Sequence, residues 1–325
     1  MFDGFETRFV DVSDTTIFCR VGGSGPPVLL LHGYPQTGAM WNDVAVGLAD
    51  HFTVVCTDLR GYGASGKPAS DDSHLAYSKR AMAQDQVEAM RALGFDTFAA
   101  AAHDRGGRVL HRMLLDHPEV VTRAAVLDIV PTRTMFESVD MTFGLDWYHW
   151  FFLAQPYDLP ERLIGADPAG YLQRKFAQWG RSGAVHHPDA LAEYERAFSD
   201  PAMIHATCED YRAAATIDLE HDRADEDARI ASPLLALWGG RGRVGQRFDV
   251  VGAWREKSAS SVEGTALDCG HYVAEEQPAA TLAALRDFFA EPGSAKHAAE
   301  PFGSRNFARL AKHAVDRLRR TRDFG

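Results

Sequence analysis

The sequence is poor in cysteine and has no long apolar run, and each absence excludes a class of protein. Its cysteines lack metal-ligand spacing, so we expect reduced, buried thiols and neither disulfides nor a metal site. No apolar run approaches the length of a membrane span, and residues 1–6 do not begin a signal peptide. We therefore expect a cytoplasmic protein without a membrane partner. The four cysteines are Cys19, Cys56, Cys208 and Cys269.

A basic excess is also absent, except near the end of the chain. The formal net charge is −11, and residues 294–325 hold eight Lys/Arg and three Asp/Glu, a net +5, so the preceding residues carry −16. Apolar residues recur at helical spacing in this tail, which predicts a basic amphipathic helix. Docking on the acidic body or disorder is the interpretation we favour over a partner subunit, anionic lipid or nucleic acid, because no binding motif is present. We expect no nucleic-acid partner.

Short apolar runs alternate with helical segments along most of the chain, which predicts an α/β fold with a mostly parallel central sheet flanked by helices. The insertion at 132–227 is aromatic-rich and helical throughout, as in a cap over the carboxyl ends of the strands. We therefore predict a core domain of residues 1–131 and 228–293, a helical cap domain of residues 132–227 inserted after the sixth strand, and a tail of residues 294–325. The clearest strand-like runs are 27–31, 52–58, 97–102, 124–131 and 234–239.

Asp104 follows one of these apolar runs and precedes a helical segment, the context of a nucleophile elbow. Small residues surround it at Ala102, Gly106 and Gly107, as a sharp turn requires. An aspartate at this position attacks a saturated carbon or an epoxide, whereas the more common serine attacks an ester. The alternative is that Asp104 only caps the helix after it, because aspartate is a favoured N-cap residue.

Three further positions match the layout of a hydrolase. The strand at 27–31 runs into His32-Gly33, whose following loop donates a backbone N–H to an oxyanion hole in this fold. His271 follows a late strand-like segment in Cys-Gly-His. Asp128 lies in an apolar run, where a carboxylate without a partner is costly, so we interpret it as the partner of His271. The spacing of these motifs is that of the α/β-hydrolase fold.

Arg105 and Arg108 lie three residues apart in the first turn of the predicted helix and so share a face. Cations at a helix N-terminus oppose its dipole, and a nearby anion would explain their presence. The planar guanidinium suits a substrate carboxylate. The alternative is that one of them pairs with a structural acid.

Together the motifs resemble the haloacetate (fluoroacetate) dehalogenase family, from the first strands to about residue 292. The combination of Asp-Arg-Gly-Gly-Arg at the elbow with His-Trp in the cap is the narrowest match. The matching segments are His-Gly-Tyr-Pro-Gln at 32–36, Asp-Leu-Arg-Gly-Tyr-Gly at 58–63, His-Asp-Arg-Gly-Gly-Arg at 103–108, Asp-Trp-Tyr-His-Trp at 146–150, Cys-Glu-Asp-Tyr-Arg at 208–212 and Cys-Gly-His at 269–271.

The resemblance implies a reaction in which Asp104 attacks the halogen-bearing carbon of a haloacid and His271, oriented by Asp128, activates water against the resulting ester. It places the substrate carboxylate on Arg105 and Arg108, and it implies a homodimer that needs no cofactor. The other assignments are the halide donors His149, Trp150 and Tyr211, and the backbone N–H groups of Tyr34 and Arg105 as the oxyanion hole.

Other functions stay open at this stage. An epoxide hydrolase would use the same nucleophile and histidine, although a neutral epoxide needs no cation pair and a tryptophan usually follows the aspartate. A dehalogenase acting mainly on chlorinated or brominated acids would keep the whole site, because pocket volume decides substrate size. A catalytically silent receptor or assembly module would not need the complete set of Asp104, His271 and Asp128.

Overall fold

The computed structural model describes residues 1–180 and 186–290 of the chain. Within them, an eight-stranded sheet has the order β1-β2-β4-β3-β5-β6-β7-β8. The pairs β1–β2 and β2–β4 are antiparallel, and the pairs from β4 through β3 to β8 are parallel. The strands are β1 (Glu6–Asp11), β2 (Thr16–Gly23), β3 (Pro27–Leu31), β4 (Thr53–Thr57), β5 (Phe98–His103), β6 (Val121–Leu127), β7 (Leu234–Gly239) and β8 (Val262–Leu267).

Burial explains the composition of the strands. All residues of β4 and β5 are buried, because helices cover both faces of the sheet and a central parallel strand then has no polar face. The edge strand β1 is mostly exposed and mixes charged with apolar residues. The prediction of a mostly parallel α/β sheet is therefore confirmed, and the hairpin of β1 and β2 adds an antiparallel edge.

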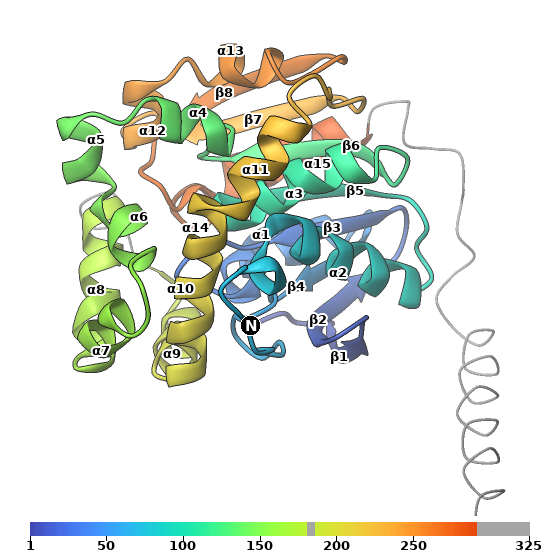
Figure 1. Cartoon of the computed structure of the whole chain (residues 1–325). Coiled ribbons are helices and arrows are strands. Elements are labelled where there is room, and N and C mark those ends of the chain that lie inside the picture. Colours follow the sequence, from blue (N-terminus) through green and yellow to red (C-terminus); the bar gives the residue numbers. More distant parts are fainter. Residues whose placement is uncertain (181–185, 291–325) are drawn as a thin grey trace, which may run out of the picture.

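The core helices flank this sheet in Figure 1. The helix α3 follows β5 directly and is buried along most of its length, so its first turn lies at the carboxyl end of the central strands. The core helices are α1 (Asn42–Leu48), α2 (Lys79–Ala92), α3 (Asp104–Asp116), α12 (Arg243–Arg247), α13 (Val250–Arg255), α14 (Val273–Glu276) and α15 (Pro278–Ala290), with short 3-10 turns η1 (Gly38–Trp41) and η2 (Leu75–Tyr77).

The stretch between β6 and β7 is helical, as predicted for an insertion after the sixth strand. The helices α8 and α10 each begin with an aspartate N-cap followed by proline, and Asp167 and Asp200 accept hydrogen bonds from backbone N–H groups of these first turns. Figure 1 shows α5 to α10 gathered beside the sheet. The helices are α4 (Thr132–Glu137), α5 (Met141–Asp146), α6 (Tyr148–Leu153), α7 (Leu159–Gly165), α8 (Pro168–Trp179), α9 (Pro188–Phe198), α10 (Pro201–Ala215) and α11 (Ile217–Ala224).

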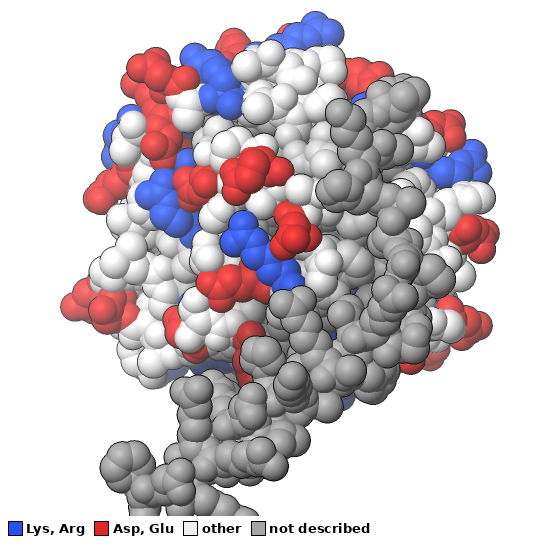
Figure 2. Space-filling model, turned by 90° about the vertical axis from the view of Figure 1, so that its right-hand side faces the viewer, with Lys and Arg blue, Asp and Glu red and all other residues white. Residues whose placement is uncertain are grey.

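The remaining predictions concern cysteines, membrane spans and the tail. All four cysteines are buried and unpaired, as expected. None of the helices in the described ranges is long and apolar enough to cross a membrane. The basic helix predicted for residues 294–325 lies outside the described residues. On the face shown in Figure 2, acidic and basic side chains of the described residues are interspersed rather than gathered into patches of one sign.

Candidate active site

Asp104 is the first residue of α3 and lies in the strained turn that follows β5. Its φ is +46°, in the left-handed region that a residue with a Cβ rarely adopts. Its Oδ1 accepts a hydrogen bond of 2.9 Å from the backbone N–H of Tyr34, so the carboxylate faces another loop instead of capping its own helix. Gly106 allows this turn, because a Cβ there would lie 2.3 Å from the carbonyl oxygen of His32. The geometry is that of a nucleophile elbow.

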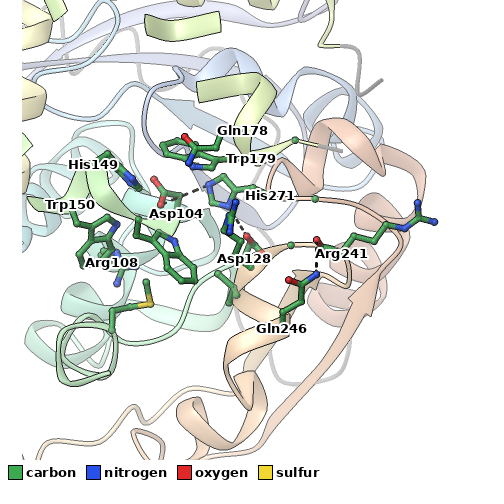
Figure 3. Close-up of a pocket in the computed structure, with 17 residues that line it drawn as sticks. Asp104, Arg108, Asp128, His149, Trp150, Gln178, Trp179, Arg241, Gln246 and His271 are labelled. Carbon is green, nitrogen blue, oxygen red and sulfur yellow. Dashed lines mark hydrogen bonds and ion pairs between the residues drawn. The ribbon is translucent and has the colours of Figure 1, made fainter. Parts of the chain in front are cut away.

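His271 joins Asp104 to Asp128. Its Nδ1 lies 2.6 Å from Oδ2 of Asp128, and its Nε2 lies 4.0 Å from Oδ2 of Asp104. Asp128 follows β6, and its Oδ1 accepts a hydrogen bond of 3.0 Å from the backbone N–H of Gly239 on β7. Figure 3 shows the three side chains in a row, with the imidazole in the middle. The structure thus brings together the three residues that the sequence analysis assigned to catalysis.

The neighbouring charges determine the protonation states of Asp104 and His271. Burial alone would raise the pKa of Asp104, but positive charge on His271 and on the nearby arginines outweighs it, and the pKa is lowered. Burial would lower the pKa of His271, but the hydrogen bond to Asp128 and the negative charges of Asp128 and Asp104 outweigh it, and the pKa is raised. Asp104 is therefore ionised, as a carboxylate nucleophile must be.

The two arginines have different surroundings. Arg105 is fully buried, and its Nε and Nη2 donate to the carboxylate of Asp210 on α10 at 3.0 and 2.6 Å. Only its Nη1 is buried without a hydrogen-bond partner. The alternative of a structural acid, which the sequence left open, thus applies to Arg105, and this side chain does not line the pocket.

Arg108 does line the pocket, and it is less well paired than Arg105. Its Nη1 donates to the carbonyl oxygen of Val130 and the hydroxyl of Thr132, whereas its Nε is buried without a partner. Among the described residues its guanidinium forms no ion pair, and it stacks on the Trp150 ring at 4.6 Å. Burial, together with the charge of Arg105, lowers the pKa of Arg108 to about 10. A bound anion would relieve both effects, so Arg108 is the stronger candidate for a carboxylate site.

His149, Trp150 and Tyr211 form an aromatic group beside the nucleophile. The Tyr211 ring lies 5.6 Å from that of His149 and 6.2 Å from that of Trp150. His149 and Trp150 line the pocket, whereas Tyr211 contacts both of their rings without lining it. Burial lowers the pKa of His149, and burial with the negative charge of Asp104 raises the pKa of Tyr211. A neutral imidazole and a protonated phenol are both hydrogen-bond donors, and the Nδ1 of His149 has no partner.

The pocket has a volume of about 260 Å³ and extends past the catalytic row. Sequence reasoning gave no role to Trp179, whose ring lies 4.5 Å from that of His149 and 5.7 Å from that of His271. The pocket is also lined by Gln178 and, after β7, by residues 241–244 and Gln246. In Figure 3 the guanidinium of Arg241 points away from the cavity. No sequence motif marks these positions, because only the folded chain brings them to the pocket.

A metal site is not evident in the part of the chain that the structure describes, since no three His, Cys, Asp or Glu side chains are grouped to hold an ion. The polar side chains that line the pocket beside Asp104 include Asp128, His149, His271 and Arg108.

The sequence and structure comparisons agree on the family of proteins that this chain resembles. A model of the alpha/beta hydrolase fold matches residues 26–278. A fluoroacetate dehalogenase from Burkholderia sp is 47% identical over 92% of this chain and 99% of its own. A soluble epoxide hydrolase from Corynebacterium sp. (strain C12) is 35% identical over 89% and 96%. A solved structure from Nostoc sp PCC 7120, described as an alpha/beta hydrolase, has a TM-score of 0.88 and 53% identity, covering 90% of this chain and 100% of that one.

The raised pKa of His271 provides a test of its partnership with Asp128. Asp128→Asn removes the negative charge and the charged acceptor beside Nδ1, so we expect the pKa of His271 to fall and the imidazole to stay neutral down to a lower pH. NMR titration of the histidine ring protons measures this change. Asp268→Asn is the matched control, because Asp268 lies in the same loop but is exposed and pairs with Arg241. An unchanged titration in Asp128→Asn would contradict the assigned partnership.

Proposed function

The chain belongs to the haloacetate dehalogenase family of α/β hydrolases, and we propose that it hydrolyses haloacetates, fluoroacetate or chloroacetate, to glycolate and halide through an ester on Asp104. The observation that carries this proposal is an ionised aspartate at the elbow near Arg108, a buried cation that forms no ion pair among the described residues. The carboxylate of a haloacid would pair with Arg108. Its halogen-bearing carbon would then lie next to the carboxylate of Asp104.

In the first step, one carboxylate oxygen of Asp104 attacks the halogen-bearing carbon, and the carbon–halogen bond breaks with its electron pair leaving on the halide. Arg108 holds the substrate carboxylate and thereby orients the carbon toward Asp104. His149 and Trp150, which line the pocket, donate hydrogen bonds to the departing halide, whose negative charge grows in the transition state. Tyr211 packs against both rings. This step needs no general base.

In the second step, Nε2 of His271 takes a proton from water, and the water oxygen attacks the ester carbonyl carbon of Asp104. Asp128 stabilises the imidazolium that forms. The backbone N–H of Tyr34 already donates to Asp104 and would stabilise the oxyanion, together with the N–H of Arg105. The carbonyl–oxygen bond to glycolate then breaks, and glycolate takes the proton from His271. The second proton of the water, left on the carboxyl group of Asp104, is released to solvent, which restores the carboxylate.

Epoxide hydrolysis is the second candidate function, because the Corynebacterium relative carries that name and the nucleophile would be the same. Arg108 argues against it, since a neutral epoxide would leave its charge uncompensated. Styrene oxide turnover distinguishes the two functions. A dehalogenase that prefers chlorinated or brominated acids would share the mechanism and differ only in its halide release rates.

Halide release by the purified protein tests the function directly. We expect fluoride from fluoroacetate and chloride from chloroacetate, and Asp104→Asn should reduce both to background, because a neutral amide does not displace halide. Ion-selective electrodes measure the two ions. Chloride without fluoride would keep the mechanism and narrow the substrate, whereas substantial release by Asp104→Asn would refute its role as the nucleophile.

Trp150→Phe tests the halide donors. The change keeps a ring against Arg108 and removes the indole N–H, so we expect fluoride release to fall about 100-fold, the effect of losing one preorganised donor. Chloride release should fall much less, because chloride is the better leaving group. The control is Trp147→Phe, since Trp147 also lines the pocket but packs on Phe143 at 4.9 Å. Equal losses with both substrates would argue against a halide role for Trp150.

We also propose that the protein is a homodimer with a small haloacid as its ligand. Large apolar side chains on the cap support a subunit contact, since Met141, Leu145 and Leu163 are 81%, 70% and 59% exposed. Sedimentation equilibrium at several concentrations should give twice the chain mass of 35.8 kDa. A monomer at every concentration would rule this proposal out.

A further inference from the structure

The backbone of His271 is held from two sides. Its N–H donates to the carbonyl oxygen of Trp179, at the end of the cap helix α8, with a distance of 3.0 Å. Its carbonyl oxygen lies 2.9 Å from Nε2 of His103, the last residue of β5 and the one before the nucleophile. The core therefore holds the general base through the residue adjacent to Asp104, while the cap holds it from the other side.

His103 is built into this contact. Its side chain is fully buried, and its ring lies 4.5 Å from the ring of His271, centroid to centroid. A carbonyl oxygen only accepts, so Nε2 of His103 carries the hydrogen. Its Nδ1 is buried without any partner, which leaves the contact with His271 as the one hydrogen bond of this side chain among the described residues.

The protonation of His103 suits a neighbour of the general base. Burial, with the charge of His271, lowers the pKa of His103 to about 3, so the ring is neutral at neutral pH. In the proposed reaction His271 becomes an imidazolium as it takes the proton from water. A second cation at this distance would oppose that charge, whereas a neutral imidazole donates its hydrogen bond without repulsion.

We propose that His103 is a positioning residue for His271: its hydrogen bond to the backbone carbonyl fixes the imidazole between the ester on Asp104 and the carboxylate of Asp128. The inference rests on the proposed function and deepens it. Because Asp104 acts without a base in the first step and His271 acts only in the second, a positioning role predicts a loss confined to ester hydrolysis.

The experiment separates the two steps in His103→Leu, with chloroacetate as substrate. Rapid-quench measurement of chloride should show a burst of about one chloride per site at the wild-type rate, followed by steady turnover slowed about 10- to 100-fold, the cost of misplacing a reacting group by roughly 1 Å. Intact-protein mass spectrometry during turnover should show the carboxymethyl ester accumulating. His103→Gln should restore much of the slow step, because its amide nitrogen reaches the place of Nε2.

The matched control is His111→Leu, since His111 is a buried histidine on α3 that contacts the Trp254 ring at 5.2 Å and lies away from the His271 loop. Both steps should keep their rates in this variant. If His103→Leu does not fold, the comparison of His103→Gln with His103→Asn tests the inference instead. Asparagine is too short to reach the carbonyl oxygen of His271, so the His103→Asn variant should hydrolyse the ester slowly.

Two results would overturn the inference. In one, burst and steady state slow by the same factor in His103→Leu, as expected for a purely structural side chain. In the other, no variant differs from the wild type. If the wild-type protein releases no halide from any haloacetate, the proposed function fails first, and this outcome differs from a wild type that turns over while the variants show no separation of steps.

Discussion

The site depends on keeping one carboxylate ionised inside a buried pocket. Asp104 has little water to solvate its charge, and cations around it must do so. Several buried cations without ion pairs would repel one another and destabilise the pocket. In this structure, most of the basic side chains near Asp104 are either paired or uncharged. Arg105 is neutralised by Asp210, whereas the rings of His149 and His103 stay uncharged because burial lowers the pKa of each. Arg108 lines the pocket and forms no ion pair among the described residues.

The pairing of buried charges also links the cap to the core. Asp210 accepts hydrogen bonds from Arg105 and from Tyr62, and it also pairs with Lys79. The next residue on α10, Tyr211, lies with its ring 4.1 Å from the guanidinium carbon of Arg105. One turn of a cap helix therefore fixes Arg105 beside the nucleophile, through the carboxylate of Asp210 and the ring of Tyr211.

Sequence reasoning succeeded where local pattern and chemistry agree. The elbow follows from small residues around Asp104, and Asp128 follows from the cost of a lone carboxylate in an apolar run. Reasoning failed where a partner comes from far along the chain: Asp210 lies 105 positions after Arg105, and no local pattern links them. His103 was part of a matched motif but received no role, although a histidine ending the buried run of β5 needs a hydrogen-bond partner. The outer pocket depends on tertiary packing and had no sequence signal.

The ion pair of Arg105 and Asp210 also bears on how such an enzyme diversifies. A cap is often regarded as an exchangeable module that adapts an unchanging hydrolase core to new substrates. Here the first turn of the core helix α3 contains a buried arginine, Arg105, whose counter-charge belongs to the cap. A foreign cap without that acid would leave a buried cation unpaired beside the nucleophile. The cap and the first turn of α3 must therefore be exchanged together to keep this ion pair.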